Sequence, residues 1–311
     1  VSGNYIYAAL EAQGLGIIDC SQFDSMYEVS VLHMPDCAEG ACIHGNIAYV
    51  ADFYSTRIVN VSDPVHPYEE NYYNNLQTWP IEVALASHYA YVAYRESGLQ
   101  IVDISEPAYP QPVGSCPTPG EARGIAVQDS LAYVADGDSG LRIINIHNPQ
   151  RPFETGYWCP FTVFINSVAV SGNYAYLAGW PQVFILNISN PQNPMCIFEY
   201  PYICDEIMKN GDYIFAGDAI LNVADPYHPY QIGACGGPGA CAVKGNYLYK
   251  IGALRLPIYD ISDISSPIQV DSLEIIGQGL TIVGDNLYIG EGDYNTFDVY
   301  QLHVVHIADP L

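Results

Sequence analysis

The chain alternates short apolar runs with small polar turns, and this pattern recurs along its whole length. The apolar runs are rich in valine, isoleucine, alanine and tyrosine, whereas the turns are rich in glycine, asparagine, aspartate and serine. Within residues 122–158, the runs "ARGIAVQ", "LAYVAD", "GLRIINI" and "FETGYW" follow one another in this way. Such runs, bounded by turn residues, predict a meander of short β-strands.

The meander is repeated eight times along the chain. Its second strand contains an aromatic residue that recurs every 34 to 43 residues, a spacing typical of four-stranded propeller blades. The runs are nearly continuously apolar, which indicates sheets that are covered on both faces by their neighbours. We therefore predict an all-β fold, a β-propeller of four-stranded antiparallel blades formed as one domain by residues 1–311, with eight blades favoured over seven.

A proline closes the third strand of most copies, and it predicts where each blade turns toward its fourth strand. Proline has no N–H for a β-ladder and keeps the preceding residue out of helix. These prolines are Pro64, Pro107, Pro149, Pro191, Pro226, Pro267 and Pro310. Shortly before them, seven of the eight copies carry Asp or Asn, as at Asp103 and Asn145. The recurrence favours a structural role, in which this side chain bonds the backbone that follows it and pre-forms the corner.

Three of these strand-and-corner segments carry a family resemblance. "GLQIVDISEP" (98–107), "GLRIINIHNP" (140–149) and "LHVVHIADP" (302–310) resemble the LVIVD-repeat family of bacterial and archaeal surface proteins. That family is similar in turn to YVTN-type surface-layer propellers. The resemblance implies a β-propeller that is usually exported, and it implies no defined catalytic activity. The sixth and seventh copies depart from the pattern, at "GDAILNVADP" and "LRLPIYDISDISSP".

The charge balance is strongly acidic, with 9 Lys and Arg against 34 Asp and Glu and a formal net charge of −25. A polyanion of this kind is repelled by nucleic acid and by anionic lipid, so neither is an expected partner. The longest segment without charge or histidine, residues 155–198, is interrupted by glycine and proline, which argues against membrane insertion. The first residues, "VSGNYIY", match the middle of a repeat, so we expect the chain to be a piece of a longer protein.

The nine cysteines favour an extracellular or cell-surface location. Two interpretations of these cysteines stay open. Either they bridge loops at one end of the propeller, or they are buried thiols that act as small hydrophobic residues. The pairs that fit the first interpretation are Cys37 with Cys42, Cys235 with Cys241, and Cys116 with Cys159.

Two motifs imitate enzyme or metal sites. "GDSGL" (137–141) is similar to a serine-protease nucleophile loop, but the preceding copy has "RESGL" (95–99) in its place, so it is interpreted as the loop between the second and third strands. The carboxylates of "DGDSG" (136–140) have calcium-like spacing without the remaining ligands. We assign no catalytic residue, no metal site and no cofactor, and leave a structural calcium as the one ion that the acidic chain would accept.

A propeller usually binds its ligands where the inner strands begin, because the loops there vary while the strands pack. Aromatic and charged side chains gather at these positions. Our candidate ligand- or partner-binding residues are Trp79, Glu82, Arg123, Trp158, Phe161, Asn166, Trp180, Asp205 and Glu206. Trp158 and Trp180 also fall within the uncharged segment 155–198, so we expect them to anchor a partner on an otherwise acidic surface.

Three functions fit these features. The first is a non-enzymatic interaction module, extracellular or on the cell surface, that binds protein or glycan through the loops. The second is an extracellular carbohydrate-active lyase or hydrolase that uses Glu82, Asp205 and Glu206 as an acidic cluster at the central pocket. The third is an architectural spacer within a larger surface protein.

Overall fold

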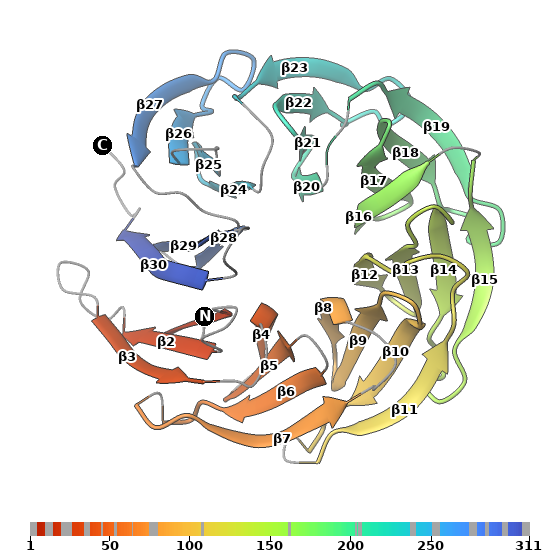
Figure 1. The fold of residues 1–311 in the computed structure, drawn as a ribbon. Helices are drawn as coiled ribbons and strands as arrows, with labels where there is room; N and C mark the ends of the chain where they lie inside the picture. Colours follow the sequence, from red (N-terminus) through yellow and green to blue (C-terminus); the bar gives the residue numbers. More distant parts are fainter. Residues whose placement is uncertain are drawn as a thin grey trace.

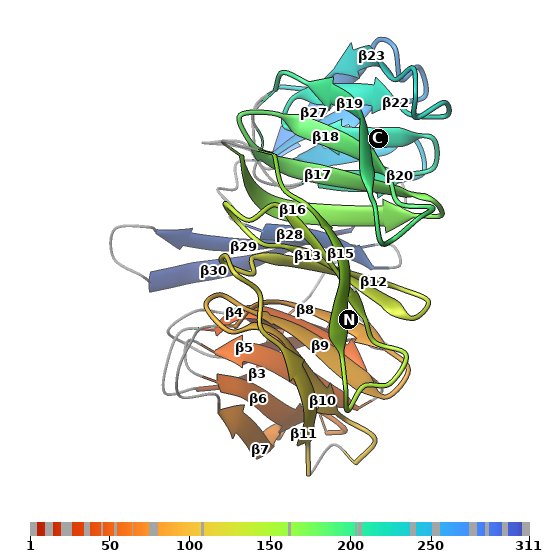
Figure 2. The ribbon, with the colours of Figure 1, turned by 90° about the vertical axis from the view of Figure 1, so that its right-hand side faces the viewer.

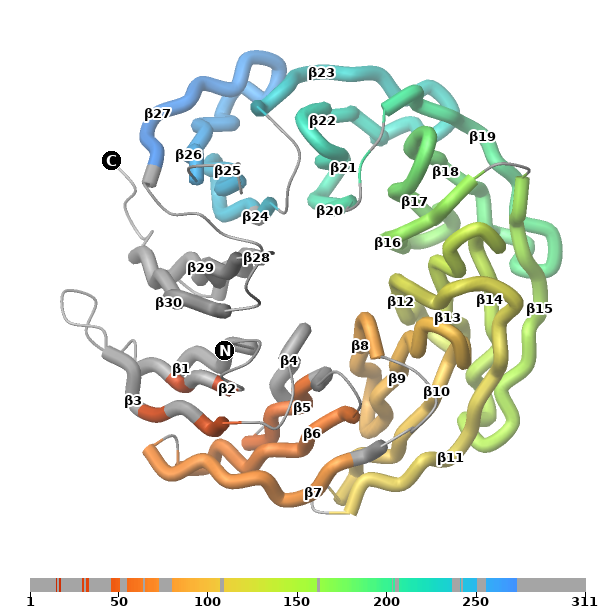
Figure 3. Tube along the Cα trace, viewed as in Figure 1, coloured from red at the N-terminus to blue at the C-terminus, as the bar shows by residue number. Residues whose placement is uncertain are grey.

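The computed structural model describes most of the chain. Figure 3 draws most of the described residues in colour and strand residues near the two ends in grey. The described residues are 5–9, 15–19, 27–33, 38–44, 46–52, 55–63, 65–74, 80–106, 109–160, 163–202, 204, 207–236, 241–250, 256–273, 279–283, 286–293 and 298–306. All of the regular structure among them is β-strand. The sheets are arranged in a ring around a common centre (Figure 1).

Six of the sheets are antiparallel meanders of four consecutive strands. The first three are β4 (Ala38–His44), β5 (Ile47–Asp52), β6 (Ser55–Asn60) and β7 (Tyr68–Asn74); β8 (Pro80–Ala86), β9 (Tyr89–Tyr94), β10 (Gly98–Asp103) and β11 (Gln111–Cys116); and β12 (Gly124–Gln128), β13 (Leu131–Ala135), β14 (Leu141–Asn145) and β15 (Phe153–Trp158). The next three are β16 (Phe164–Ser171), β17 (Tyr174–Trp180), β18 (Val183–Asn187) and β19 (Met195–Tyr200); β20 (Ile207–Asn210), β21 (Tyr213–Ala216), β22 (Ala219–Asn222) and β23 (Tyr230–Ala234); and β24 (Cys241–Lys244), β25 (Tyr247–Lys250), β26 (Leu256–Asp260) and β27 (Ile268–Leu273).

Two three-stranded sheets are formed by the described residues nearest the two ends of the chain. They are β1 (Tyr5–Ala9), β2 (Leu15–Asp19) and β3 (Tyr27–Leu32), and β28 (Gly279–Val283), β29 (Asn286–Asp293) and β30 (Asp298–His306). The predicted all-β fold of four-stranded antiparallel blades is confirmed for the six complete sheets. The preference for eight blades over seven stays a prediction.

The first strand of each complete sheet lies at the centre of the ring, and the fourth lies at the rim (Figure 1). Neighbouring blades meet along their first strands, since β8 contacts β12, β12 contacts β16, and β16 contacts β20. In the view from the side, the rim strands β15 and β19 are nearest the reader (Figure 2). The inner strands therefore bring residues from many parts of the chain to one central region.

The hydrophobic core lies between the blades, and each cluster draws on two neighbouring sheets. Tyr133 and Leu141 of one sheet pack with Val168, Leu177 and Phe184 of the next, all at 8% exposure or less. Full burial of an aliphatic or aromatic side chain of this size stabilises the fold by about 1.5–3 kcal/mol. Because neighbouring blades cover the second and third strands in this way, strands such as β9, β13 and β14 are buried almost throughout, as the sequence pattern indicated, whereas the rim strands β11 and β15 carry exposed residues.

The corner interpretation of the repeated Asp or Asn is confirmed. In six copies this side chain accepts a hydrogen bond from the backbone N–H two residues later. The pairs are Asn60 with Ser62 (2.9 Å), Asp103 with Ser105 (2.9 Å), Asn145 with His147 (3.0 Å), Asn187 with Ser189 (2.9 Å), Asn222 with Ala224 (3.0 Å) and Asp260 with Ser262 (2.8 Å). Pro149, Pro191, Pro226 and Pro267 fall between the third and fourth strands, as expected, whereas Pro64, Pro107 and Pro310 lie outside the described residues.

Replacing Asp103 with alanine should lower the free energy of unfolding by about 1 kcal/mol, because the N–H of Ser105 loses its acceptor. Equilibrium urea unfolding measures the change. Asp103→Asn is the matched control and should be nearly neutral, since Asn145 and Asn187 make the same bond in later copies. A loss as large for asparagine as for alanine would contradict the corner role.

The predicted disulfides are not formed where the structure describes the residues. The thiols of Cys116 and Cys159 are unbridged, and so is that of Cys235, which excludes its bond to Cys241. Cys116 and Cys235 are buried, and burial raises the pKa of both thiols, so they match the alternative of small hydrophobic residues. The remaining pair is Cys37 with Cys42. It lies outside the described part of the structure, which includes neither Cys37 nor the side chain of Cys42.

Candidate functional site on the loop face

The candidate binding residues lie at one end of the blades. In the sheet β12–β15, Gly124 pairs with Ala135, Ala135 with Leu141, and Leu141 with Trp158, so the start of the first strand and the loop between the second and third strands share one end. We call this end the loop face, and the opposite end, which carries the Asp or Asn corners, the corner face. The inner-strand starts expected from the sequence therefore lie on the loop face.

Backbone bulges mark the beginning of several inner strands. Register shifts leave Glu39, Ile81 and Asn166 as extra residues in β4, β8 and β16, one or two residues after each strand begins. Arg123 holds the equivalent place before β12 and donates its backbone N–H to Ala135. A bulge re-aims the side chain of its extra residue. Of the candidate binding residues, Asn166 is thus a bulge residue, and Arg123 holds the equivalent place in its own blade.

Two arginines on the loop face share one carboxylate. Arg95 donates from Nε and Nη2 to Glu121, at 2.9 and 3.2 Å, and Arg123 donates from Nε to the same carboxylate at 3.3 Å. The three side chains are about one third exposed, at 31%, 32% and 37% for Arg95, Arg123 and Glu121. The hydrogen bond from Arg95 is the largest influence on Glu121 and holds the pKa of this carboxyl below its usual range, so the carboxylate stays ionised.

An aromatic pair continues this arrangement into the next blade. The guanidinium of Arg123 lies over the ring of Phe164, 5.0 Å from its centroid. Phe164 pairs directly with Trp180 across β16 and β17, so the two side chains project from the same face of the sheet. Trp180 is 55% exposed. We name the set Arg95, Glu121, Arg123, Phe164 and Trp180 the Arg–Trp strip.

Backbone bonds between blades hold the strip in place. The N–H of Ala122 donates to the carbonyl of Arg95 at 2.8 Å, which fixes Glu121 and Arg123 beside the preceding blade. On the other side, Gly137 and Ile165 exchange two hydrogen bonds of 3.2 and 2.9 Å between the β13–β14 loop and β16. Gly137 has φ +56°, and a Cβ there would lie 3.3 Å from Phe164 Cε2, so glycine meets both the backbone and the space requirement.

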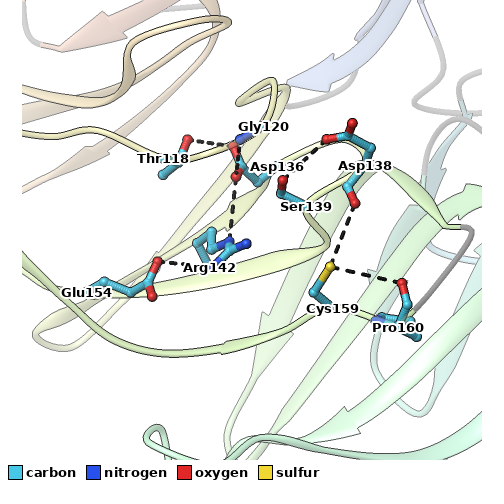
Figure 4. A network of polar contacts seen from close by, with 9 residues as sticks. All are labelled: Thr118, Gly120, Asp136, Asp138, Ser139, Arg142, Glu154, Cys159 and Pro160. Atoms are coloured by element: carbon cyan, nitrogen blue, oxygen red, sulfur yellow. Dashed lines mark hydrogen bonds and ion pairs between the residues drawn. The ribbon is translucent and has the colours of Figure 1, made fainter.

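A buried ion pair joins Asp136, the residue before Gly137, to Arg142 of β14 (Figure 4). Asp136 is completely buried and accepts hydrogen bonds from Thr118 Oγ1 at 2.5 Å and from the N–H of Gly120 at 2.9 Å. Its carboxylate is 3.6 Å from Nε of Arg142. Nη1 of the same arginine is 3.4 Å from the carboxylate of Glu154. Burial outweighs these partners and raises the pKa of Asp136.

The other predicted site residues have different outcomes. Glu82 accepts a hydrogen bond of 2.7 Å from the N–H of Ile125 in the next blade, so its carboxylate links two blades. Trp158 is half-buried and packs edge-on against Phe184 of the next sheet, with ring centroids 4.8 Å apart. Asn166 is the half-buried bulge residue of β16. Trp79, Phe161, Asp205 and Glu206 lie outside the described residues.

Sequence reasoning missed Arg95 and Glu121 and did not include Phe164 among its site residues. A signal was available for the arginine, because the whole chain holds only nine Lys and Arg. Nothing local marks Glu121, since its role depends on Arg95, 26 residues earlier and in the preceding blade.

The motifs that imitate enzyme and metal sites have structural roles. Residues 137–140 form the β13–β14 loop as predicted, where Gly140 adopts φ +76° and Ser139 Oγ donates to Asp138 at 3.2 Å. The oxygens of Asp136 are engaged by Thr118, Gly120 and Arg142. In the described part of the chain, no three His, Cys, Asp or Glu side chains group as metal ligands. The same residues contain no helix of the length and apolarity that a membrane span requires.

The ring of meanders with inner strands at its centre defines the class of this protein as a β-propeller. The family comparison makes this specific, since the LVIVD repeat model matches residues 1–32, 38–75, 81–118, 119–158, 165–201 and 239–274. The chain belongs to the LVIVD repeat family, which confirms the resemblance that the sequence carried.

Solved structures share the fold at low sequence identity. The computationally designed Ika8 protein has a TM-score of 0.78 and 11% identity, over 99% of this chain and 94% of that chain. AztD from Citrobacter koseri has a TM-score of 0.62 and 12% identity, over 97% and 94%. U3-55K has a TM-score of 0.59 and 12% identity, over 79% and 84%. A search of curated proteins finds no match to this chain. At these identities the likeness shows the fold alone.

Proposed function

We propose that this propeller is a non-enzymatic interaction module, extracellular or on the cell surface, that binds a protein or glycan partner through its loop face. The observation that carries the proposal is the Arg–Trp strip. It combines an indole that is 55% exposed with a guanidinium whose orientation is fixed by Glu121 and Phe164, and Phe164 is the cross-strand partner of the indole. Exposed Trp and Arg side chains with supported geometry are the residue types that most often anchor interfaces.

The setting of the strip supports the same function. Trp180 lies within residues 155–198, which contain no charged residue or histidine, in a chain of formal net charge −25. An aromatic side chain in an uncharged segment has less competing hydration than one among carboxylates. The acidic composition and the scarcity of lysine support the extracellular or surface location, and a structural calcium ion remains part of this proposal.

The enzyme alternative has less support. It required Glu82 to act with Asp205 and Glu206 at the central pocket. The carboxylate of Glu82 instead accepts the backbone N–H of Ile125 and so contributes to the contact between two blades. A carboxylate that is held by a backbone N–H of the next blade is less available to reach a substrate as a general acid or base.

Trp180→Ala should weaken partner binding at least tenfold, because it removes the exposed anchor of the loop face. Binding is measured with the labelled chain on arrays of cell-surface proteins and of glycans. Tyr230→Ala is the matched control, since Tyr230 is 56% exposed at the start of β23 on the corner face, and this variant should bind like the wild type. The opposite pattern would move the binding site to the corner face. A wild-type chain that binds neither array would favour the architectural spacer.

A further inference from the structure

We propose that the ligand of the Arg–Trp strip is a neutral, pyranose-based glycan that stacks on Trp180 and hydrogen-bonds to Arg123 and Glu121. This inference rests on the proposed function and deepens it, since it names the chemical class that the same site takes. It follows from three properties of the strip: its flat apolar platform, its fixed donor and acceptor, and its small exposed extent.

The platform is the indole of Trp180. The side chain stands at the end of β17, opposite Phe164 and on the same side of the sheet, with more than half of its surface open to water. A pyranose ring has an apolar face of C–H groups and a rim of hydroxyls. The apolar C–H face fits the electron-rich face of an indole. The hydroxyls of the rim then remain free to bond polar neighbours.

The polar neighbours are a donor and an acceptor held in one place. The Nε of Arg123 donates a hydrogen bond of 3.3 Å to Glu121. The guanidinium also lies over the ring of Phe164, 5.0 Å from its centroid, and these two contacts fix its position. A guanidinium has five N–H donors, and Arg123 donates from Nε to Glu121 among the described residues. Glu121 accepts three bonds from the two arginines, and a carboxylate has room for about four. Side chains that are ordered before binding lose little entropy when a ligand arrives.

The charge of the chain favours a neutral glycan over an acidic one. Arg95 and Arg123 are partly neutralised by the ionised Glu121, so the strip is not a strong anion site. Around it the chain carries 34 Asp and Glu, which repel a polymer of uronic acids. A neutral sugar avoids this repulsion and still uses both members of the Arg123 and Glu121 pair.

The extent of the strip favours a sugar over a protein surface. A stable protein interface buries about 800 Å² per partner and involves about 20–30 residues on each side. Within the described strip, Trp180 is the single side chain that is more than half exposed, beside three polar side chains that are about one third exposed. One open aromatic ring with two adjacent polar groups has the dimensions of one or two sugar units.

Saturation-transfer NMR and calorimetry with neutral oligosaccharides of glucose, mannose, galactose and N-acetylglucosamine test the proposal, with oligogalacturonate as the acidic probe. We expect at least one neutral probe to bind the wild-type chain, with an affinity that is unchanged between low and high salt. Trp180→Ala should reduce that affinity at least tenfold, and Trp180→Phe should restore part of it. Arg123→Met, which retains an apolar stem over Phe164, should also weaken binding about tenfold, and Tyr230→Ala should not.

Three outcomes would overturn the glycan class: binding of oligogalacturonate alone, binding of no probe, or neutral binding that Trp180→Ala leaves unchanged. Because Trp180 is largely exposed, its substitution leaves the fold intact, and a thermal melt verifies this for each variant. If the wild-type chain binds a protein on the array and Trp180→Ala abolishes that signal, the interaction module stands and only the glycan class fails. If neither array gives a signal, both proposals fail.

Discussion

Replacing Asp136 with alanine should lower the free energy of unfolding by about 3 kcal/mol. The substitution removes one of the two carboxylates beside the buried Arg142, the one that faces its Nε, and it leaves Thr118 Oγ1 and the N–H of Gly120 without their acceptor. Removal of one partner from a buried ion pair costs about 3–5 kcal/mol. Glu154, 3.4 Å from Arg142, still pairs with the arginine in this variant. The expected loss of stability is therefore at the lower end of that range. Equilibrium urea unfolding measures it.

Two further variants separate charge from hydrogen bonding at this site. Asp136→Asn retains an oxygen acceptor for Thr118 and Gly120 and should lose less stability than Asp136→Ala. Arg142→Met in the Asp136→Ala background should recover part of the loss, because no unpaired charge is then buried. The methionine also keeps an apolar chain near Tyr157, whose ring is 4.8 Å from the guanidinium of Arg142. Losses that simply add in the double variant would show that the two side chains are not coupled.

The same substitution links stability to the candidate site. Asp136 precedes Gly137, whose backbone bonds to Ile165 hold β16 beside the β13–β14 loop. Phe164, the residue before Ile165 in β16, supports the guanidinium of Arg123. The buried pair therefore fixes the loop from which the Arg–Trp strip is positioned, although neither of its members belongs to the strip.

The fold could be predicted because its signals are local and repeated. Each strand is a short apolar run, each turn has its own residues, and each corner depends on a bond between residues two positions apart, as between Asp103 and Ser105. Eight similar copies in one chain make such a pattern hard to mistake. Two candidate residues that were chosen near the starts of inner strands, Arg123 and Asn166, lie at or beside such a start.

The candidate site could be predicted only in part, because its contacts join different blades. Arg123 and Trp180 were selected as variable residues at strand ends, but Phe164, which lies between them, is 41 residues from Arg123 along the chain. Glu82 was selected for the same reason as Arg123. In the structure, its carboxylate instead accepts a hydrogen bond from the N–H of Ile125, which is 43 residues later in the chain. A sequence pattern indicates which positions vary. Which of these side chains meet depends on how adjacent blades pack.

The same comparison of copies identifies Lys250 as an outlier in the core. It follows the aromatic residue of β25, at a position that is apolar and at most 1% exposed in the five preceding blades of the ring. The equivalent residues are Val50, Val92, Val134, Leu177 and Ala216. Lys250 is also completely buried, and its ammonium donates a hydrogen bond to the carbonyl of Gly217 in the preceding blade. A buried ammonium loses several kcal/mol of hydration that one carbonyl does not restore.

Lys250→Met should therefore raise the free energy of unfolding by about 2 kcal/mol. The unbranched methionine fills the same space without a charge, and replacement of buried charged groups by apolar ones of similar volume is worth up to about 4 kcal/mol. The lost bond to Gly217 offsets about 1 kcal/mol of this gain. Equilibrium urea unfolding measures the change, with Lys244→Met as control, since Lys244 is only partly buried on β24 and should change stability by less than about 0.5 kcal/mol. A clear loss of stability in Lys250→Met would mean that the ammonium is better compensated than its bond to Gly217 indicates, and that this blade depends on the charge.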